Sequence, residues 1–230
     1  MIIDIIRSGG DIDFVYVAVA LMSAIAVIFI TLPIHEFAHG FIAEKLGDKT
    51  PRWQGRITLN PFAHIDWFGA AFIILFGFGW AKPVQVNMRA FKNPKVGMAI
   101  VAIAGPLSNL IVALICMLLI NALGLIPIAS FTVYKILYYV VNFFSQIAWI
   151  NITLAVFNLI PVPPLDGSRV LTAFLPYKYY NMLMQYEQYI HFILMFLIFS
   201  DVLDKPIMLA SGAIGGLLEK LAYLPFSFLG

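Results

Sequence analysis

Long runs without a single charged residue dominate this sequence and limit what it can fold into. Phe14 to Leu32 contains no Asp, Glu, Lys or Arg, and neither does Val96 to Ile120 or Ile136 to Leu165. About 20 apolar residues suffice to cross the hydrocarbon core of a bilayer as a helix. Since 62% of the residues are hydrophobic and only 11% are charged, a soluble domain is excluded. We therefore expect an all-α polytopic membrane protein.

The runs predict a bundle of four transmembrane helices, with room for a fifth or sixth. The fourth is a weaker span from Tyr186 to Ser200, and Pro206 to Leu218 is an amphipathic or partial span, so the placement of 206–230 is left open. No basic segment precedes the first run and no small-residue cleavage site follows it, which favours a retained span. We expect residues 1–230 to form one transmembrane domain, with Met1 to Asp13 as an interfacial lead.

A shorter apolar segment between the first two runs has a different pattern. Trp67 to Ala81 is too short to span a bilayer and is interrupted by Gly69, Gly77 and Gly79. This pattern favours a re-entrant β-hairpin or strand over residues 67–88. Irregular backbone at membrane depth is tolerated only where protein buries it or a watery cavity faces it. We therefore expect this element to lie against the functional site.

The basic residues gather in one part of the chain. Eight of the fourteen Lys and Arg residues lie between Lys45 and Lys95. The positive-inside bias then places this region in the cytoplasm and the N-terminus outside. We expect a multi-pass protein of the cytoplasmic membrane, with its site toward the cytoplasmic side. Because the basic residues are few and follow this membrane pattern, no nucleic-acid partner is predicted.

The first run ends in the motif His35-Glu36-Phe37-Ala38-His39. On a helix, His35 and His39 project from one face and can bind one divalent zinc, while Glu36 beside them handles a water proton. A chance match or a pair of core histidines is the simpler alternative. Neither accounts for Glu36, because ionisable groups at membrane depth are costly and usually have a partner or a function. The motif predicts a zinc hydrolase with one Zn²⁺ per chain.

A hydrolytic zinc site needs a third protein ligand and an open position for water. Asp166 is our choice, because it follows a proline-broken helix at the cytoplasmic end of a span and Gly167 frees the backbone beside it. An Asp-Gly pair alone is more often an ordinary turn. Four other side chains compete for the role: His64, Asp66, Glu187 and His191. The first two lie in a polar loop where solvated positions are expected, and the last two could pair with each other on a helix.

The second long run carries small residues near its middle. Ala104, Gly105 and Ser108 allow another helix to approach closely, and Asn109 offers a polar side chain. A packing seam without chemistry is an equal alternative for this element. The single cysteine, Cys116, cannot form an intramolecular disulfide and is interpreted as a packing residue.

Together these residues resemble the site-2 protease family of intramembrane zinc metalloproteases. The helix motif is similar at His35, Glu36 and His39, and the later Asn158 to Gly167 is similar to a family segment that ends in Asp-Gly. The segment Gly105-Pro106-Leu107-Ser108-Asn109 and the stretches 59–69 and 77–83 look like those of the compact prokaryotic branch. No insertion of the size of a PDZ or CBS domain is present in the sequence.

The resemblance implies that Asp166 is the third ligand and that Asn158 and Pro164 lie near the substrate. The implied reaction is hydrolysis of peptide bonds within or near transmembrane helices, with Glu36 as the proton acceptor from zinc-bound water. The substrate helix must be unwound before attack. Strand addition along Phe72 to Trp80, with Asn109 as a hydrogen-bond partner, would hold it extended.

Two other functional classes remain open from the sequence. A membrane metal or proton transporter would use buried His and Asp residues as an ion path, although here the polar groups converge on one depth. A catalytically silent scaffold would have no use for Glu36. The expected partners are a transmembrane protein or peptide substrate and membrane lipid.

Overall fold

The computed structural model describes residues 14–76, 79–200 and 202–228, so the predicted lead at residues 1–13 lies outside the described part. All regular secondary structure in these residues is helical. The elements, in chain order, are α2 (Phe14–Ala26), the π-helix η1 (Val27–Thr31), α3 (Leu32–Lys45), α4 (Thr50–Trp53), η2 (Pro61–Ala63), α5 (Trp67–Phe76), η3 (Met88–Ala90), α6 (Pro94–Leu123), α7 (Phe131–Asn158), α8 (Asp166–Phe174), α9 (Tyr177–Gln185), α10 (Glu187–Phe199), α11 (Asp204–Tyr223) and η4 (Leu224–Phe226).

Four helical segments of the described chain are long and apolar enough to cross a membrane. They are Phe14–Lys45, Pro94–Leu123, Phe131–Asn158 and Asp204–Phe226. The first three lie where the charge-free runs predict them. The fourth does not, because α10 has only 13 residues, or about 20 Å of helix against a hydrocarbon core of about 30 Å. The prediction of a span at 186–200 was therefore wrong by length, and the C-terminal segment is the longer candidate.

The first span departs from regular α-helix just before the His motif. The π-helix η1 ends two residues before Pro33, which lies in the first turn of α3. Because the helix continues through this point, Pro33 removes one N–H donor from the ladder, and a π-helical adjustment is one way in which a transmembrane helix accommodates such a proline. The side chain of Thr31, at the end of η1, accepts a 3.1 Å hydrogen bond from the Nδ2 of Asn151 on α7. This bond ties the start of the motif helix to the neighbouring span.

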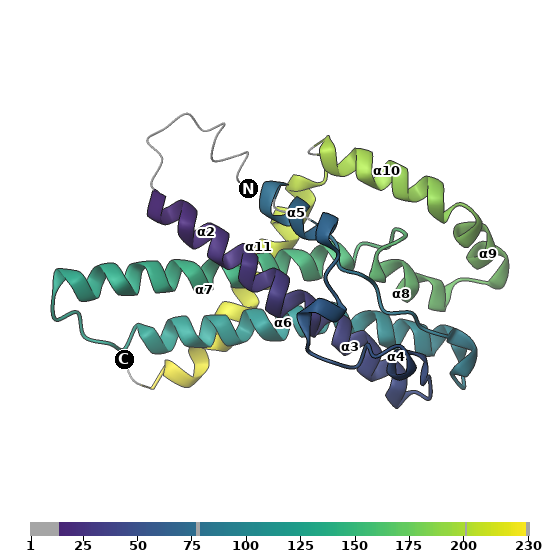
Figure 1. Ribbon diagram of the computed structural model, residues 1–230, viewed down its shortest axis with the longest axis horizontal. Coiled ribbons are helices and arrows are strands. Elements are labelled where there is room, and N and C mark those ends of the chain that lie inside the picture. The colour runs from purple at the N-terminus through teal and green to yellow at the C-terminus, as the bar shows by residue number, and fades with distance from the viewer. Residues whose placement is uncertain (1–13, 77–78, 201, 229–230) are drawn as a thin grey trace.

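Helix α6 is the centre of the bundle. It packs against α3, α7, α8 and α11, and Figure 1 shows it running beside α7 in the opposite direction. The core between α6 and α7 is built from Ala113, Cys116, Ile147, Ala148 and Ile152. Cys116 is a buried free thiol in this core, as its interpretation as a packing residue predicts.

The re-entrant β-hairpin predicted over residues 67–88 is wrong. Trp67–Phe76 forms helix α5, and residues 79–87 are irregular. A strand needs backbone partners on a neighbouring strand, whereas a helix satisfies its own N–H and C=O groups in apolar surroundings. Gly69 has a packing role instead: a Cβ there would lie 2.9 Å from the backbone nitrogen of Trp80. The irregular segment therefore lies directly against α5.

Candidate metal centre

Helix α3 supplies two imidazoles and a carboxylate, all three of them buried. His35, Glu36 and His39 are 7%, 8% and 8% exposed. The Nε2 atoms of the two histidines are 3.1 Å apart, and their rings meet edge to face at 84°. The four-residue spacing therefore produces the shared helix face that the sequence predicts, with both Nε2 atoms directed at one point.

Asp166, 127 residues after His39, brings a carboxylate to the same point. Its Oδ2 lies 3.4 Å from the Nε2 of His35 and 3.3 Å from that of His39. Asp166 is the first residue of α8, which packs on α6 after the proline-rich turn. Gly167 makes this fold possible, because a Cβ there would lie 2.6 Å from the carbonyl oxygen of Ile160.

Helix α6 approaches the histidines through a glycine. A Cβ at Gly105 would lie 2.5 Å from Cε1 of His35 and 2.6 Å from its Nε2, and would also overlap His39. Any larger residue at this position would therefore displace a ring. The small-residue stretch of the second span serves this contact, which identifies Gly105 as a residue that shapes the site.

The three side chains fit a zinc ion. Atoms at the corners of a tetrahedron about 2.0–2.1 Å from zinc lie about 3.3–3.4 Å from one another. The observed separations among His35 Nε2, His39 Nε2 and Asp166 Oδ2 are 3.1, 3.3 and 3.4 Å. Among the described residues this is the group of His, Cys, Asp and Glu that could hold a metal ion. Three ligands leave a fourth tetrahedral corner for water.

A backbone carbonyl fixes the tautomer of one histidine. His39 Nδ1 lies 2.8 Å from the carbonyl oxygen of Val101 on α6. Because a carbonyl only accepts, Nδ1 carries the proton and Nε2 is left as a ligand atom. With the histidines neutral, Asp166 supplies the negative charge of the set, and a metal binds it as a carboxylate.

Glu36 faces a different partner. Its Oε2 accepts a 2.9 Å hydrogen bond from the backbone N–H of Val84, which lies in the irregular segment after α5. The carboxylate is therefore held next to the three candidate ligands without being one of them. Glu36 is therefore not one of the three residues whose side chains converge on a single point.

The three predicted substrate-contacting residues lie in different environments. Asn109 is one turn beyond Gly105 on α6, is 1% exposed, and neither polar atom of its side chain has a partner among the described residues. Asn158 donates from Nδ2 to the carbonyl oxygen of Leu154 at 3.0 Å. Pro164 is exposed and follows a cis peptide bond from Pro163.

The competing ligand candidates have other partners or lie in solvent. His64 is fully buried rather than solvated, so that prediction was wrong, and its Nε2 pairs with the carbonyl oxygen of Thr58 at 2.9 Å. Asp66 accepts from the N–H of Gly69. His191 is exposed, so the pair expected between Glu187 and His191 is replaced by another. The partner of Glu187 is Arg169 on α8, at 2.8 Å.

The sequence interpretation missed the buried carboxylate of Asp48. It is 1% exposed and accepts from the N–H of Thr50 at 2.9 Å and from that of Asn87 at 2.7 Å. Asp48 thereby ties the segment that contacts Glu36 to the end of α3. Its only sequence signal is an acidic residue in an otherwise basic loop.

The matching family model and the matching relatives all describe metalloproteases or peptidases. A model of Peptidase family M50 matches residues 121–200. The "Putative zinc metalloprotease YwhC" of Bacillus subtilis is 41% identical over 167 residues, which cover 71% of this chain and 74% of that protein. The "Zinc metalloprotease MJ0392" of Methanocaldococcus jannaschii is 26% identical over 66% of this chain and 34% of its own length.

A further relative bears the same kind of name. The "Putative zinc metalloprotease Rip2" of Mycobacterium tuberculosis H37Rv is 32% identical over 62% of this chain and 53% of its own length. No solved structure matches at a significant level. The matched relatives carry the name of zinc metalloprotease, so the transporter and the silent scaffold are not favoured.

Proposed function

The chain belongs to peptidase family M50, the site-2 protease family of intramembrane zinc metalloproteases, and on this premise we propose which of its residues carry the reaction. The protein is a zinc metalloprotease with the helices of a multi-pass membrane protein. The roles of individual residues, the approach of the substrate and the side of the membrane are our proposals.

We assign His35, His39 and Asp166 as the zinc ligands. One observation carries this assignment: the three mutual separations of 3.1 to 3.4 Å equal the edges of a tetrahedron around zinc, within a few tenths of an ångström. Gly105 lets the rings approach α6, and the Val101 carbonyl orients His39. Zinc, when bound, supplies a Lewis acid for a water and for the scissile carbonyl.

We assign Glu36 as the general base and then the general acid. It accepts a proton from the attacking water and delivers it to the leaving amine of the cleaved peptide bond. The Val84 N–H donates to Oε2 and so fixes the orientation of the carboxylate. The other oxygen, Oε1, is available to accept the proton. Glu36 is only 8% exposed, which limits the access of bulk water to this transfer.

The proposed substrate is a transmembrane helix of another protein, unwound where it is cut. A helix hides its carbonyl groups in hydrogen bonds, so an unwound segment brings exposed N–H and C=O groups that need partners at membrane depth. Asn109 offers a donor and an acceptor, both without a partner among the described residues. We propose that Asn158, at the end of α7, and Pro164, in the turn that leads into Asp166, line the path of the substrate.

We also propose that the protein resides in the cytoplasmic membrane with the zinc site toward the cytoplasm. The support is the charge pattern, since Lys45 to Lys95 holds eight of the fourteen basic residues and follows the motif helix directly. The other face then carries the loop between α6 and α7, which has no charged residue from Asn121 to Thr132.

The test uses purified protein and a single-pass model substrate in the same membrane mimetic. Wild type should cleave the substrate and stop when zinc is chelated. Glu36→Gln should keep about one zinc per chain and lose about 10²- to 10⁴-fold in turnover, the contribution of general acid and base catalysis. Asp166→Ala should lose both zinc and turnover. Normal zinc in Asp166→Ala, or normal turnover in Glu36→Gln, would contradict the assignment.

A further inference from the structure

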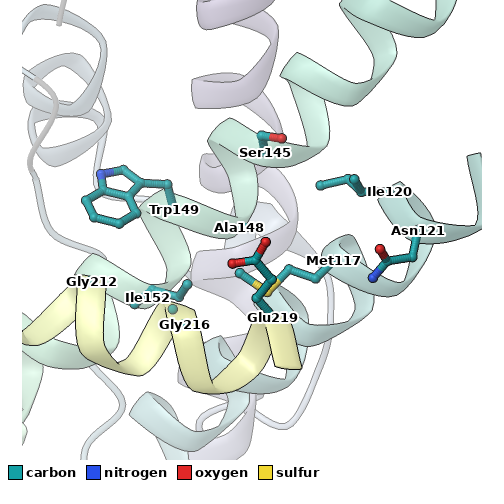
Figure 2. Close-up of a pocket in the computed structure, with 11 residues that line it drawn as sticks. Met117, Ile120, Asn121, Ser145, Ala148, Trp149, Ile152, Gly212, Gly216 and Glu219 are labelled. Carbon is teal, nitrogen blue, oxygen red and sulfur yellow. The ribbon is translucent and has the colours of Figure 1, made fainter. Parts of the chain in front are cut away.

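A cavity lies far from the metal centre, between α6, α7 and α11. Its volume is about 420 Å³, and Figure 2 shows Asn121 of α6, Ser145 and Trp149 of α7 and Glu219 of α11 around it. Asn121 is sixteen residues beyond Gly105 on the same helix, about 24 Å along its axis. The reaction at the metal centre makes no use of this cavity.

The wall of the cavity is largely apolar, with three polar groups. Met117, Ile120 and Ile152 are among the apolar residues, and the polar groups are the Asn121 amide, the Ser145 hydroxyl and the Glu219 carboxylate. Glu219 has no cation of the described chain within ion-pair distance. A ligand pocket has this composition, with apolar walls that hold the body of a ligand and a few polar groups that orient it.

A neighbouring hollow extends the site toward a positive charge. It measures about 360 Å³ and shares Asn121, Gly216 and Glu219 with the first cavity, while adding Lys220 and Tyr223. Negative and positive side chains therefore stand side by side at the mouth of one apolar cavity. Tyr223, at the end of α11, provides an aromatic ring of the kind that occurs at the level of lipid headgroups.

Helix α11 forms its side of the cavity from glycines. Gly212 and Gly216 line it, and a Cβ built on either residue meets no atom within 4 Å. The space above both glycines is therefore part of the cavity rather than filled by neighbouring side chains. An acyl chain fits such a shallow apolar channel, because it needs no polar partners.

We propose that this cavity binds a zwitterionic phospholipid with a primary amine, phosphatidylethanolamine. The ammonium group meets the Glu219 carboxylate, the Asn121 amide oxygen and the Ser145 hydroxyl. The phosphate meets Lys220 and the Tyr223 hydroxyl, and one acyl chain lies along Gly212 and Gly216.

The charge pattern selects this lipid over the other common headgroups. Three N–H donors of a primary ammonium match three acceptors that line the cavity, whereas a choline headgroup has no N–H and phosphatidylglycerol has no cation to meet Glu219. A lipid with only an anionic headgroup would bring a negative charge toward this carboxylate, which is unfavourable.

The test is native mass spectrometry of the full-length protein with equal amounts of POPE, POPC and POPG. Wild type should retain one POPE with a preference of about tenfold or more over each of the others, the effect expected of charge-assisted hydrogen bonds. Glu219→Gln should reduce this preference to within about twofold. Asp204→Asn, at the other end of α11, is the matched control and should keep the wild-type preference.

Gly216→Leu tests the cavity itself. Its side chain enters open space, so the fold should be kept, as judged by melting temperature and by zinc content at the distant metal centre. POPE retention should be lost. Quenching of Trp149 by brominated POPE, with Trp149→Phe as the control for the other three tryptophans, reports the same binding by an independent signal.

Several results would overturn the proposal. Equal retention of the three lipids, an unchanged preference in Glu219→Gln, or POPE binding to Gly216→Leu would each do so. Displacement of POPE by water-soluble glycerophosphoethanolamine would assign the site to a soluble amine. If the wild type formed a dimer without retained POPE, and Gly216→Leu dissociated that dimer, a second copy of the chain would cover the glycines.

Discussion

Gly105→Ala is the smallest change that should disable the metal centre without touching a proposed ligand. Gly105 lies on α6 where the helix meets His35 and His39. Alanine is a better helix former than glycine by about 1 kcal/mol, so α6 itself is not weakened. Any loss of function would therefore come from the added methyl group.

The size of the effect follows from two distances. The new Cβ would lie 2.5 Å from Cε1 and 2.6 Å from Nε2 of His35, whereas non-bonded carbon atoms pack at about 3.5 Å. Relief needs a displacement of about 1.0 Å, against a tolerance of about 0.2 Å for zinc–ligand distances. Loss of an outer partner of a ligand already costs about 10- to 100-fold, so displacement of a ligand should cost about 100-fold or more in zinc affinity.

The assay measures zinc per chain by elemental analysis and cleavage of the model substrate, together with a melting curve. Gly105→Ala should fall to a small fraction of one zinc per chain and lose turnover. Gly212→Ala is the matched control, because its Cβ meets no atom within 4 Å, and it should retain both zinc and turnover.

One result would refute this reasoning. If Gly105→Ala bound one zinc per chain and cleaved substrate at the wild-type rate, the contact between α6 and the histidine rings would not control the site. If the melting curve of Gly105→Ala showed no folded state, unfolding would explain the loss of zinc. Gly105→Ser would then test whether the loss of zinc follows side-chain volume.

Three other predictions concern hydrogen bonds that hold the site in place. Val84→Pro removes the N–H that binds Glu36 and should lower turnover about 10- to 100-fold with zinc retained, whereas Val84→Ala should match wild type. Asp48→Asn keeps one acceptor oxygen and replaces the other with an NH₂ donor, so one of the two backbone N–H groups bound by Asp48 loses its partner. This should cost about 2 kcal/mol of stability in chemical unfolding; unchanged stability would contradict it. Asn151→Leu keeps the branched shape but removes the bond to Thr31 and should cost about 1 kcal/mol. Asn142→Leu, which removes an exposed bond on the same helix, is the control.

The transmembrane helices could be predicted because their signal is local. A charge-free run must bury its backbone groups in its own helix, whatever surrounds it, and this held for the first three spans. The prediction of a strand at 67–88 failed, because the glycines were read as strand breaks. Gly69 instead lies in a helix and lets the backbone of Trp80 approach closely. Prediction also failed for the fourth span, where the lengths of α10 and α11, and not their hydrophobicity alone, decided which helix can cross.

The site was only partly accessible from the sequence. The spacing of His35 and His39 defines one helix face, so their proximity is local. The position of Asp166 depends on how α8 packs on α6 and on Gly167 beside Ile160, which no local pattern contains. The burial of His64 and the carboxylate of Asp48 have the same origin, because each is paired with backbone groups of a folded loop.

The sequence by itself determined that the chain lies in a membrane as helices and that a zinc motif ends the first of them, because hydrophobicity and helical periodicity act over a few neighbouring residues. Only the tertiary structure decided which carboxylate joins His35 and His39, that α6 must carry a glycine where they meet, and that Glu219 faces a cavity about 24 Å away along α6. These depend on contacts between segments far apart in the chain, and packing of whole helices sets such contacts.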